Sequence, residues 1–412
     1  MSEAVAMQEA VRQMGDPVST GEALNQVHRP KFPIALFGLA VVLTVLGIAM
    51  QYLVYTHLTP DTAILSDTYL QRTILYNAIG LGLLLLCIFG NYMYLAKGAW
   101  ILLAIFLLGL LPPWFFGFYG RQYTLCYYLA LVYPLVYALL LYRLRDKGAK
   151  AIWFLHGLTL LFLVRMLFGT IITWSTVLAA GCLTLLLLCL AIHRGILTGS
   201  SKRTLWLLTV LPYVAAAACF VILFFQNSYM RDRLTEFLKG SNYVQQMLAL
   251  EQQQMLAFGG GTISSYVDTE SLASTYVLHS IFLWFGIVSG ILVIVALAVL
   301  VLRSLHYALH QSNRLALLAG TAASGILLFE LLHFVLTNLG CSPVYTASVP
   351  FLSYGFANSV FNSLLGRHHA GDNPQPKCAV GNDGFFAGSA RLNSQVSCNT
   401  GRLFKGCYGN SC

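Results

Sequence analysis

The sequence predicts an all-α protein, a polytopic bundle of transmembrane helices. Of the 412 residues, 58% are hydrophobic and only 9% are charged, and long runs without a charge recur along the chain. A soluble domain carries about 25% charged residues, and each run is close to the ~20 residues that a helix needs to cross the hydrocarbon core. A large soluble helical protein is excluded, because water could not solvate so apolar a surface.

Nine apolar runs are clear as spans, and a tenth is truncated. The nine are residues 32–55, 73–95, 98–118, 123–142, 151–169, 171–192, 204–226, 273–302 and 315–339. The tenth begins near Ser353 and breaks at Arg367. We therefore predict a membrane domain over residues 32–365. Residues 1–31 form a cytoplasmic tail, which is no signal peptide because it carries acidic residues and lacks an apolar core.

Basic residues collect in alternate connections between the spans. One set comprises Arg12, Arg29, Lys31, Lys97, Arg143, Arg145, Lys147, Lys150, Arg194, Lys202, Arg203, Arg303 and Arg314. The opposite connections hold only Arg72, Arg121, Arg231, Arg233 and Lys239. Because basic loops remain in the cytoplasm, the N-terminus is predicted inside. The net charge of +9 is explained in the same way, and we predict no nucleic-acid partner.

The longest external connection on this topology is residues 227–272. It contains Arg231, Arg233 and Lys239, followed by "EQQQMLAFGGGTISSYVDTES". Long connections of this kind are often functional, and a floppy tether is the alternative. The glycine run is not a nucleotide-binding P-loop, because neither GKS nor GKT follows it.

A second external segment, Val344 to Gly355, reads "VYTASVPFLSYG" and follows the ninth span. Pro350 lies within it, and helix interiors reject proline. Irregular backbone at membrane depth is tolerated only where protein or a water-filled cavity satisfies it. We therefore predict a re-entrant segment that lines an outward-opening cavity. A plain proline-rich loop is the alternative.

The stretch "GCSPVYTASVPFLSYGFAN", Gly340 to Asn358, resembles the C-terminal signature of the SEDS family of bacterial membrane proteins, the RodA, FtsW and SpoVE type. Upstream, "YMRDRLTEFLKG" and "QQQMLAFGGG" resemble two further family segments, with Arg233, Gln253, Gly259 and Gly261 in register. "LQRTILYNAIGLGLLLLCIFGNYMYL" resembles the family's second span. The resemblance covers about residues 70–360.

This resemblance implies a ten-span protein of the bacterial cytoplasmic membrane that polymerises lipid II into peptidoglycan strands outside the cell membrane, in cell elongation, division or sporulation. It implies a class B penicillin-binding protein as the crosslinking partner. Lipid II has an apolar tail, which needs a groove among the membrane lipids, and a pyrophosphate, which needs cations. A divalent cation can assist the departure of the pyrophosphate. The sequence predicts no set of metal ligands, and it indicates no other cofactor.

The predicted substrate site lies on the external side. Arg231 and Arg233 are expected to hold the pyrophosphate, because the arginine fork matches phosphate oxygens; anchoring at lipid headgroups is the alternative. The resemblance adds Gln253, Gly259, Gly261, Pro350, Ser353, Tyr354 and Gly355 to this site.

The chain departs from the family at its ionisable positions. With the sequences aligned on Gly286, Thr275 stands where the family has the aspartate that acts as general base. A threonine hydroxyl cannot accept a proton near neutral pH, as such a base must. The nearest external acids, Asp268 and Glu270, are candidate substitutes; otherwise they are solvated loop charges.

Three functions therefore stay open. The first is a glycosyltransferase of weakened or lost activity, and the second is a non-catalytic scaffold that binds lipid II or the penicillin-binding protein. The third and weakest is a flippase for lipid-linked precursors, which needs charged side chains within spans. We identify Arg165, His279 and His333 as side chains of this kind, and the histidines are expected to bond backbone carbonyls.

The end of the chain, residues 366–412, is polar and glycine-rich, and its cysteines match no zinc pattern. It is either a genuine disordered tail or a frameshifted end.

Overall fold

The computed structural model describes residues 34–58, 69–89, 96–111, 122–167, 174–259, 275–311 and 313–342. All of them belong to one compact unit, Phe32–Gly371, and no strand occurs among them. Residues 1–31 and 366–412, which were predicted to be tails, lie outside the described residues, and so does any tenth span.

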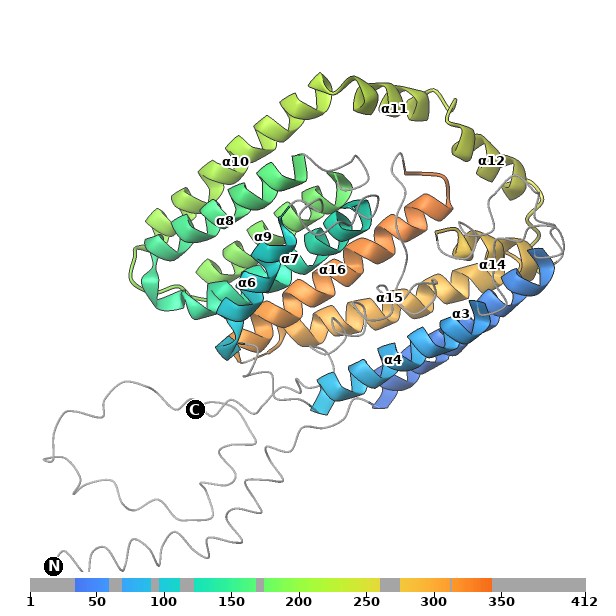
Figure 1. The fold of residues 1–412 in the computed structure, drawn as a ribbon, viewed down its shortest axis with the longest axis horizontal. Helices are drawn as coiled ribbons and strands as arrows, with labels where there is room; N and C mark the ends of the chain where they lie inside the picture. The colour runs from blue at the N-terminus through green and yellow to red at the C-terminus, as the bar shows by residue number, and fades with distance from the viewer. Residues whose placement is uncertain are drawn as a thin grey trace, which may run out of the picture. The chain divides into compact units, whose positions relative to one another are not determined.

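The described residues are almost entirely helical, in an order that Figure 1 follows from blue to red. The helices are α3 (Ile34–Leu58), α4 (Tyr69–Phe89), α6 (Ala99–Gly109), α7 (Gln122–Arg143), α8 (Ala149–Leu167), α9 (Trp174–His193), α10 (Lys202–Gln226), α11 (Ser228–Leu238), α12 (Tyr243–Gln252), α14 (Val277–Phe285), α15 (Ile287–Leu309) and α16 (Arg314–Asn338). A short 3₁₀ helix, Arg145–Lys147, joins α7 to α8.

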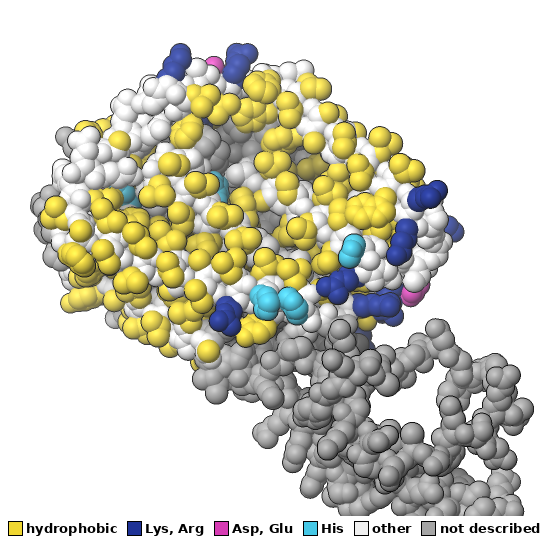
Figure 2. Space-filling view, turned by 180° about the vertical axis from the view of Figure 1, so that it is seen from behind, with side chains coloured by type: hydrophobic (Ala, Val, Ile, Leu, Met, Phe, Trp, Pro, Cys, Tyr) yellow, Lys and Arg dark blue, Asp and Glu magenta, His cyan; other side chains and the backbone are white. Residues whose placement is uncertain are grey.

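Among the described residues, five helices are long and apolar enough to cross a membrane, namely α8, α9, α10, α15 and α16. Figure 2 shows the matching surface: hydrophobic side chains cover most of the visible face, and lysine and arginine gather at its rims. The predicted all-α membrane bundle is confirmed. The count of nine spans plus a tenth stays a prediction.

Helix α16 is the central element, because it packs against α7, α9, α14 and α15 and buries most of its side chains. Small residues allow this closeness. At Gly325 an added Cβ would lie 2.5 Å from Leu183 of α9. By contrast, the extensive contacts of α10 are with α8, α9 and α11. Most of its side chains are exposed.

The remaining interior is aromatic where α6, α7 and α8 meet. The rings of Tyr133 and Phe162 stack with centroids 4.2 Å apart, and Phe106 stacks on Tyr133. Nearby, the Arg165 side chain donates a hydrogen bond of 2.8 Å from Nε to the Leu110 carbonyl at the end of α6. A carbonyl therefore satisfies this intramembrane arginine, as arginines within spans require.

One predicted span proves to be two helices. Residues 273–302 were expected to form a single span, but α14 ends at Phe285 and α15 begins at Ile287. Gly286 between them has φ +91° and ψ 169°, a conformation that is almost restricted to glycine. The break is a correction to the predicted span, and it is due to this glycine.

Backbone carbonyls from the long connection of residues 227–272 accept the hydrogen bonds at this break. The N–H groups of Ile287 and Val288 donate to the carbonyls of Leu256 and Ala257, at 3.0 and 3.3 Å. These are orphan donors of the first helical turn. A Cβ on Gly286 would lie only 2.5 Å from the Ala257 oxygen. The segment around Ala257 therefore replaces the hydrogen bonds that an unbroken helix would make.

We expect Gly286→Ala to destabilise the protein, because it adds a disfavoured backbone conformation and a clash with Ala257. The strain alone costs about 1–3 kcal/mol. Thermal unfolding in detergent, followed by circular dichroism, measures the effect. The matched control is Gly38→Ala in α3, where an added Cβ meets no heavy atom within 4 Å. Equal melting temperatures for the two variants would contradict this account of the break.

Candidate functional site

The connection of residues 227–272 begins with two helices, α11 and α12, which continue the path of α10 in Figure 1. Helix α11 is largely exposed. Arg231 lies on it with its Nε 3.9 Å from the carboxylate of Asp232. Arg233 donates to the Tyr229 hydroxyl at 2.8 Å. Two guanidinium groups are thus presented on one accessible helix.

Helix α12 is attached to the bundle by a buried ionisable pair. The Nε2 of His279 in α14 lies 2.8 Å from Oε2 of Glu251 in α12, and the two side chains are 0% and 1% exposed. One hydrogen bond joins Nε2 of His279 to the Glu251 carboxyl group. The expectation that His279 bonds a backbone carbonyl is therefore corrected. With both side chains enclosed, the pair fastens two helices and does not face a substrate.

Asn338 at the end of α16 joins the same junction. Its Oδ1 accepts a hydrogen bond from the backbone N–H of His279, and its Nδ2 donates to the carbonyl of Thr275, both at 2.9 Å. Thr275 is half-buried. Its backbone thus lies at the meeting point of α12, α14 and α16, which we call the junction (Glu251, Thr275, His279 and Asn338).

Two further predicted site residues border the junction. Gln253 follows α12 directly and is exposed. Gly259 has φ +54° and lies beside the helix break, where an added Cβ would be 3.6 Å from the Trp284 carbonyl. The structure thus places Gln253, Gly259 and Thr275 around α14, with Arg231 and Arg233 one helix away.

The other predicted site residues lie outside the described residues, so their placement stays a prediction. They are Gly261, Asp268, Glu270, Pro350, Ser353, Tyr354 and Gly355.

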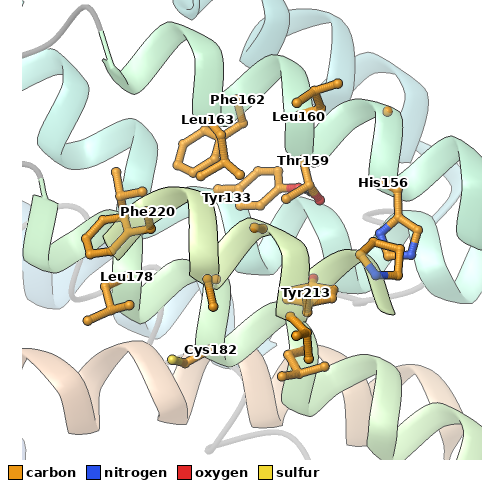
Figure 3. A pocket seen from close by; sticks show the side chains of 18 of the residues that line it. Tyr133, His156, Thr159, Leu160, Phe162, Leu163, Leu178, Cys182, Tyr213 and Phe220 are labelled. Carbon is orange, nitrogen blue, oxygen red and sulfur yellow. Dashed lines mark hydrogen bonds between the residues drawn. The ribbon is translucent and has the colours of Figure 1, made fainter. Parts of the chain in front are cut away.

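A separate feature is a cavity of about 590 Å³ between α7, α8, α9 and α10. Figure 3 shows its lining, which is mostly apolar and includes Leu160, Leu163, Leu178 and Phe220. Its size falls within the 300–1,000 Å³ typical of ligand pockets. Three of the four helices around the cavity, α8, α9 and α10, are long and apolar enough to cross a membrane, so an apolar chain is the chemistry that suits it.

Polar groups in this cavity are satisfied by neighbouring helices. Pro212 within α10 lacks an N–H, so it cannot bond the Leu208 carbonyl four residues earlier. Nε2 of His156 in α8 lies 2.9 Å from that carbonyl. The Tyr213 hydroxyl donates to Thr184 of α9 at 2.9 Å. These bonds attach the otherwise exposed α10 along one side of the cavity.

Sequence reasoning missed two buried carboxylates. Glu251 belongs to a run that the sequence predicts to be polar and external. Glu330 lies within the ninth predicted span. The signal for Glu330 was present, since an acidic residue within a span is functional by default. The signal for Glu251 was absent, because its partner His279 is 28 residues away and only the fold joins them.

Comparison with known proteins gives a clear result for the fold. No family model matches the chain, and no curated protein matches it. Solved structures do match. A chain from a peptidoglycan synthase complex, studied for the structural coordination of polymerization and crosslinking, gives a TM-score of 0.54 at 19% identity, covering 82% of this chain and 96% of that one. A mutant of Rod shape determining protein RodA from Thermus thermophilus gives 0.50 at 17% identity, covering 83% and 96%.

The chain has the RodA fold. It is a multi-pass membrane protein, and the fold implied by the sequence resemblance is confirmed. The match extends over nearly the full length of the RodA chain.

No cluster of three or more histidine, cysteine, aspartate or glutamate side chains that could hold a metal ion occurs within the described part of the chain.

The buried pair at the junction should be strongly coupled. Removing one partner of a buried pair costs about 3–5 kcal/mol, because the other is left uncompensated. We expect Glu251→Ala and His279→Ala each to lower the unfolding free energy by this order, and the double variant to lose much less than the sum. Thermal unfolding in detergent measures the coupling.

The exposed pair on α11 is the matched control for that cycle. Arg231 and Asp232 are both more than half exposed, and such pairs contribute about 0–1 kcal/mol. Asp232→Ala should leave the melting temperature nearly unchanged. Additive effects at Glu251 and His279 would show that the two side chains do not stabilise each other.

Proposed function

We propose that this protein is a SEDS-type component of peptidoglycan assembly that binds lipid II at its external side. The observation that carries the proposal is the RodA fold over 82–83% of the chain, together with the motifs of residues 70–360 that resemble the same family. The protein works in the bacterial cytoplasmic membrane, with its N-terminus inside.

The chemistry of lipid II supports this proposal at two separate places. Its polyisoprenyl tail is a long apolar chain, and the cavity between α7 and α10 offers about 590 Å³ of mostly apolar lining within the bundle. Its pyrophosphate is anionic, and Arg231 and Arg233 present guanidinium groups on α11, the helix that directly follows α10. A tail beside α10 and a phosphate near α11 are therefore compatible along the chain.

Polymerisation is the activity that the site supports least. Glycosyl transfer needs a base that takes the proton of the attacking hydroxyl, and Thr275 cannot supply it. The Glu251–His279 pair, which is the ionisable pair of this junction, is enclosed at 1% and 0% exposure. We therefore favour binding without efficient turnover. Asp268 and Glu270 remain the candidates for a displaced base.

A scaffold of this kind needs a partner with the missing activity. The matched structure from a peptidoglycan synthase complex supports a partner synthase, and we propose a class B penicillin-binding protein with a single transmembrane helix. The exposed apolar faces of the bundle permit helix packing in the membrane.

Thr275→Asp should not create polymerase activity, although the substitution restores the carboxylate of the family position. A base alone contributes 10²–10⁴-fold. By the same resemblance, however, Leu283 and Trp284 stand where the family has polar residues, and misplacement costs ~10²-fold more. Purified wild type and variant are assayed with lipid II for glycan chains on gels. Wild-type polymerisation that Asp268→Ala or Glu270→Ala abolishes would restore the enzyme reading.

Binding of lipid II should depend on the cavity. Ala216 lines it, so the larger side chain of Ala216→Trp fills part of the space. Each methylene of the tail that loses contact costs about 0.8 kcal/mol. Because several methylenes should lose contact, binding should weaken by at least ~10-fold. The matched control is Leu211→Trp on the same helix, at a position that is 73% exposed and does not line the cavity. Binding is measured by native mass spectrometry in detergent. Equal losses for both variants would remove the tail from this cavity.

A further inference from the structure

One face of α16 carries polar side chains that the proposed function does not use. Glu330, His333 and Thr337 are three and four residues apart, so they lie on one side of the helix. They are 3%, 8% and 3% exposed. Glu330 lies eight residues before Asn338, about 12 Å below the end of the helix at the predicted external side. A carboxylate at this depth is costly unless it is paired or bound to a cation.

The hydrogen-bond partners of Glu330 and Thr337 are incomplete. The Tyr127 hydroxyl of α7 donates to Oε1 of Glu330 at 3.4 Å, which is a long hydrogen bond. Oε2 of Glu330 and the Thr337 hydroxyl oxygen are buried and have no hydrogen-bond partner among the described residues. Buried polar atoms are normally bonded, so an unpartnered carboxylate oxygen indicates a missing ligand.

The end of α16 brings another polar group back to this face. The N–H of Gly340 bonds the Thr337 carbonyl and the N–H of Cys341 bonds the Leu336 carbonyl, at 3.1 and 2.8 Å. With φ +72° at Gly340, this is the pattern of a Schellman motif, which terminates a helix and reverses the chain. The reversal places Oγ of Ser342 3.3 Å from Nε2 of His333.

We propose that Glu330 and His333 form half of a site for a divalent transition-metal cation, on the face of α16 where Ser342 returns. The sequence Glu330-Leu331-Leu332-His333 has the Glu-x-x-His spacing with which helices of metal-binding bundles direct a carboxylate and an imidazole at one ion. Oε2 of Glu330 is the first ligand, and a ring nitrogen of His333 is the second. Tyr127 holds Oε1 and orients the carboxylate, as outer-shell partners of metal ligands do.

The donor set selects the kind of cation. Carboxylate and hydroxyl oxygens suit Mg²⁺, Ca²⁺ and Mn²⁺, while imidazole suits transition metals. A mixed pair of one carboxylate and one imidazole therefore favours Mn²⁺ or a similar ion. Two protein ligands leave the remaining coordination positions to water.

The competing explanation is a structural role, in which Glu330 only bonds Tyr127. A second pair of histidines supplies the control for non-specific binding. His306 and His310 are both exposed near the end of α15, with ring centroids 4.2 Å apart. They have the i, i+4 spacing that binds metals on helix surfaces but include no carboxylate.

Full-length protein in nanodiscs is titrated with Mn²⁺, and free Mn²⁺ is followed by electron paramagnetic resonance. We expect one bound Mn²⁺ per chain. Glu330→Gln and His333→Gln should each weaken binding at least ~10-fold, since even outer-shell changes cost 10–100-fold. The double variant His306→Gln/His310→Gln should bind Mn²⁺ as the wild type does. Mn²⁺ should also raise the melting temperature of the wild type and not that of Glu330→Gln.

Several outcomes would overturn the site. The first is that the wild-type protein binds no Mn²⁺. The second is that the double variant His306→Gln/His310→Gln loses Mn²⁺ binding. The third is that Glu330→Gln binds Mn²⁺ as tightly as the wild type. If Glu330→Gln fails to fold, His333→Gln and the melting shift of the wild type decide alone. Lipid II binding is measured separately in the presence of EDTA. Its failure would count against the proposed function, and Mn²⁺ binding would still stand.

Discussion

The break at Gly286 is the constraint on which the described part of the connection between α10 and α14 depends. An interrupted helix leaves backbone N–H groups without partners, and at the membrane these groups must be satisfied by protein. The carbonyls of Leu256 and Ala257 satisfy them, which fixes the segment after α12 against the start of α15. The segment of residues 256–259 is thus a structural complement to the broken helix, and Gly259 within it has φ +54°, a conformation that favours glycine.

The same requirement explains the polar contacts inside the bundle. Pro212 leaves a carbonyl without its helical donor, and His156 of a neighbouring helix lies within bonding distance of it. Arg165 donates to a helix-terminal carbonyl, and Asn338 links the backbones of Thr275 and His279. Each of these bonds crosses from one helix to another. Polar groups that need a hydrogen-bond partner inside the bundle therefore also determine which helices lie next to each other.

The proposed binding of lipid II and the glycosyl transfer of the family that the chain resembles would depend on different parts of the fold. An apolar cavity between α7 and α10 and the arginines of α11 would suffice for a lipid-linked anion to bind. Glycosyl transfer also needs a base within hydrogen-bond reach of a hydroxyl. At the junction the sequence resemblance puts Thr275 in that place, and the Glu251–His279 pair is enclosed. For this reason we propose binding without efficient turnover.

The sequence by itself determined the class of the protein. Apolar runs near the span length and few charges are sufficient for a helical membrane bundle, because the requirement for internal hydrogen bonding leaves few alternatives. Local motifs also indicated the RodA-like fold, even at 17–19% identity. The tertiary structure alone decided that residues 273–302 contain a break, since φ +91° at Gly286 depends on the backbone packed against it. It alone paired Glu251 with His279 and Tyr127 with Glu330, which are 28 and 203 residues apart. No local pattern encodes such pairs, because they arise only when distant helices pack side by side.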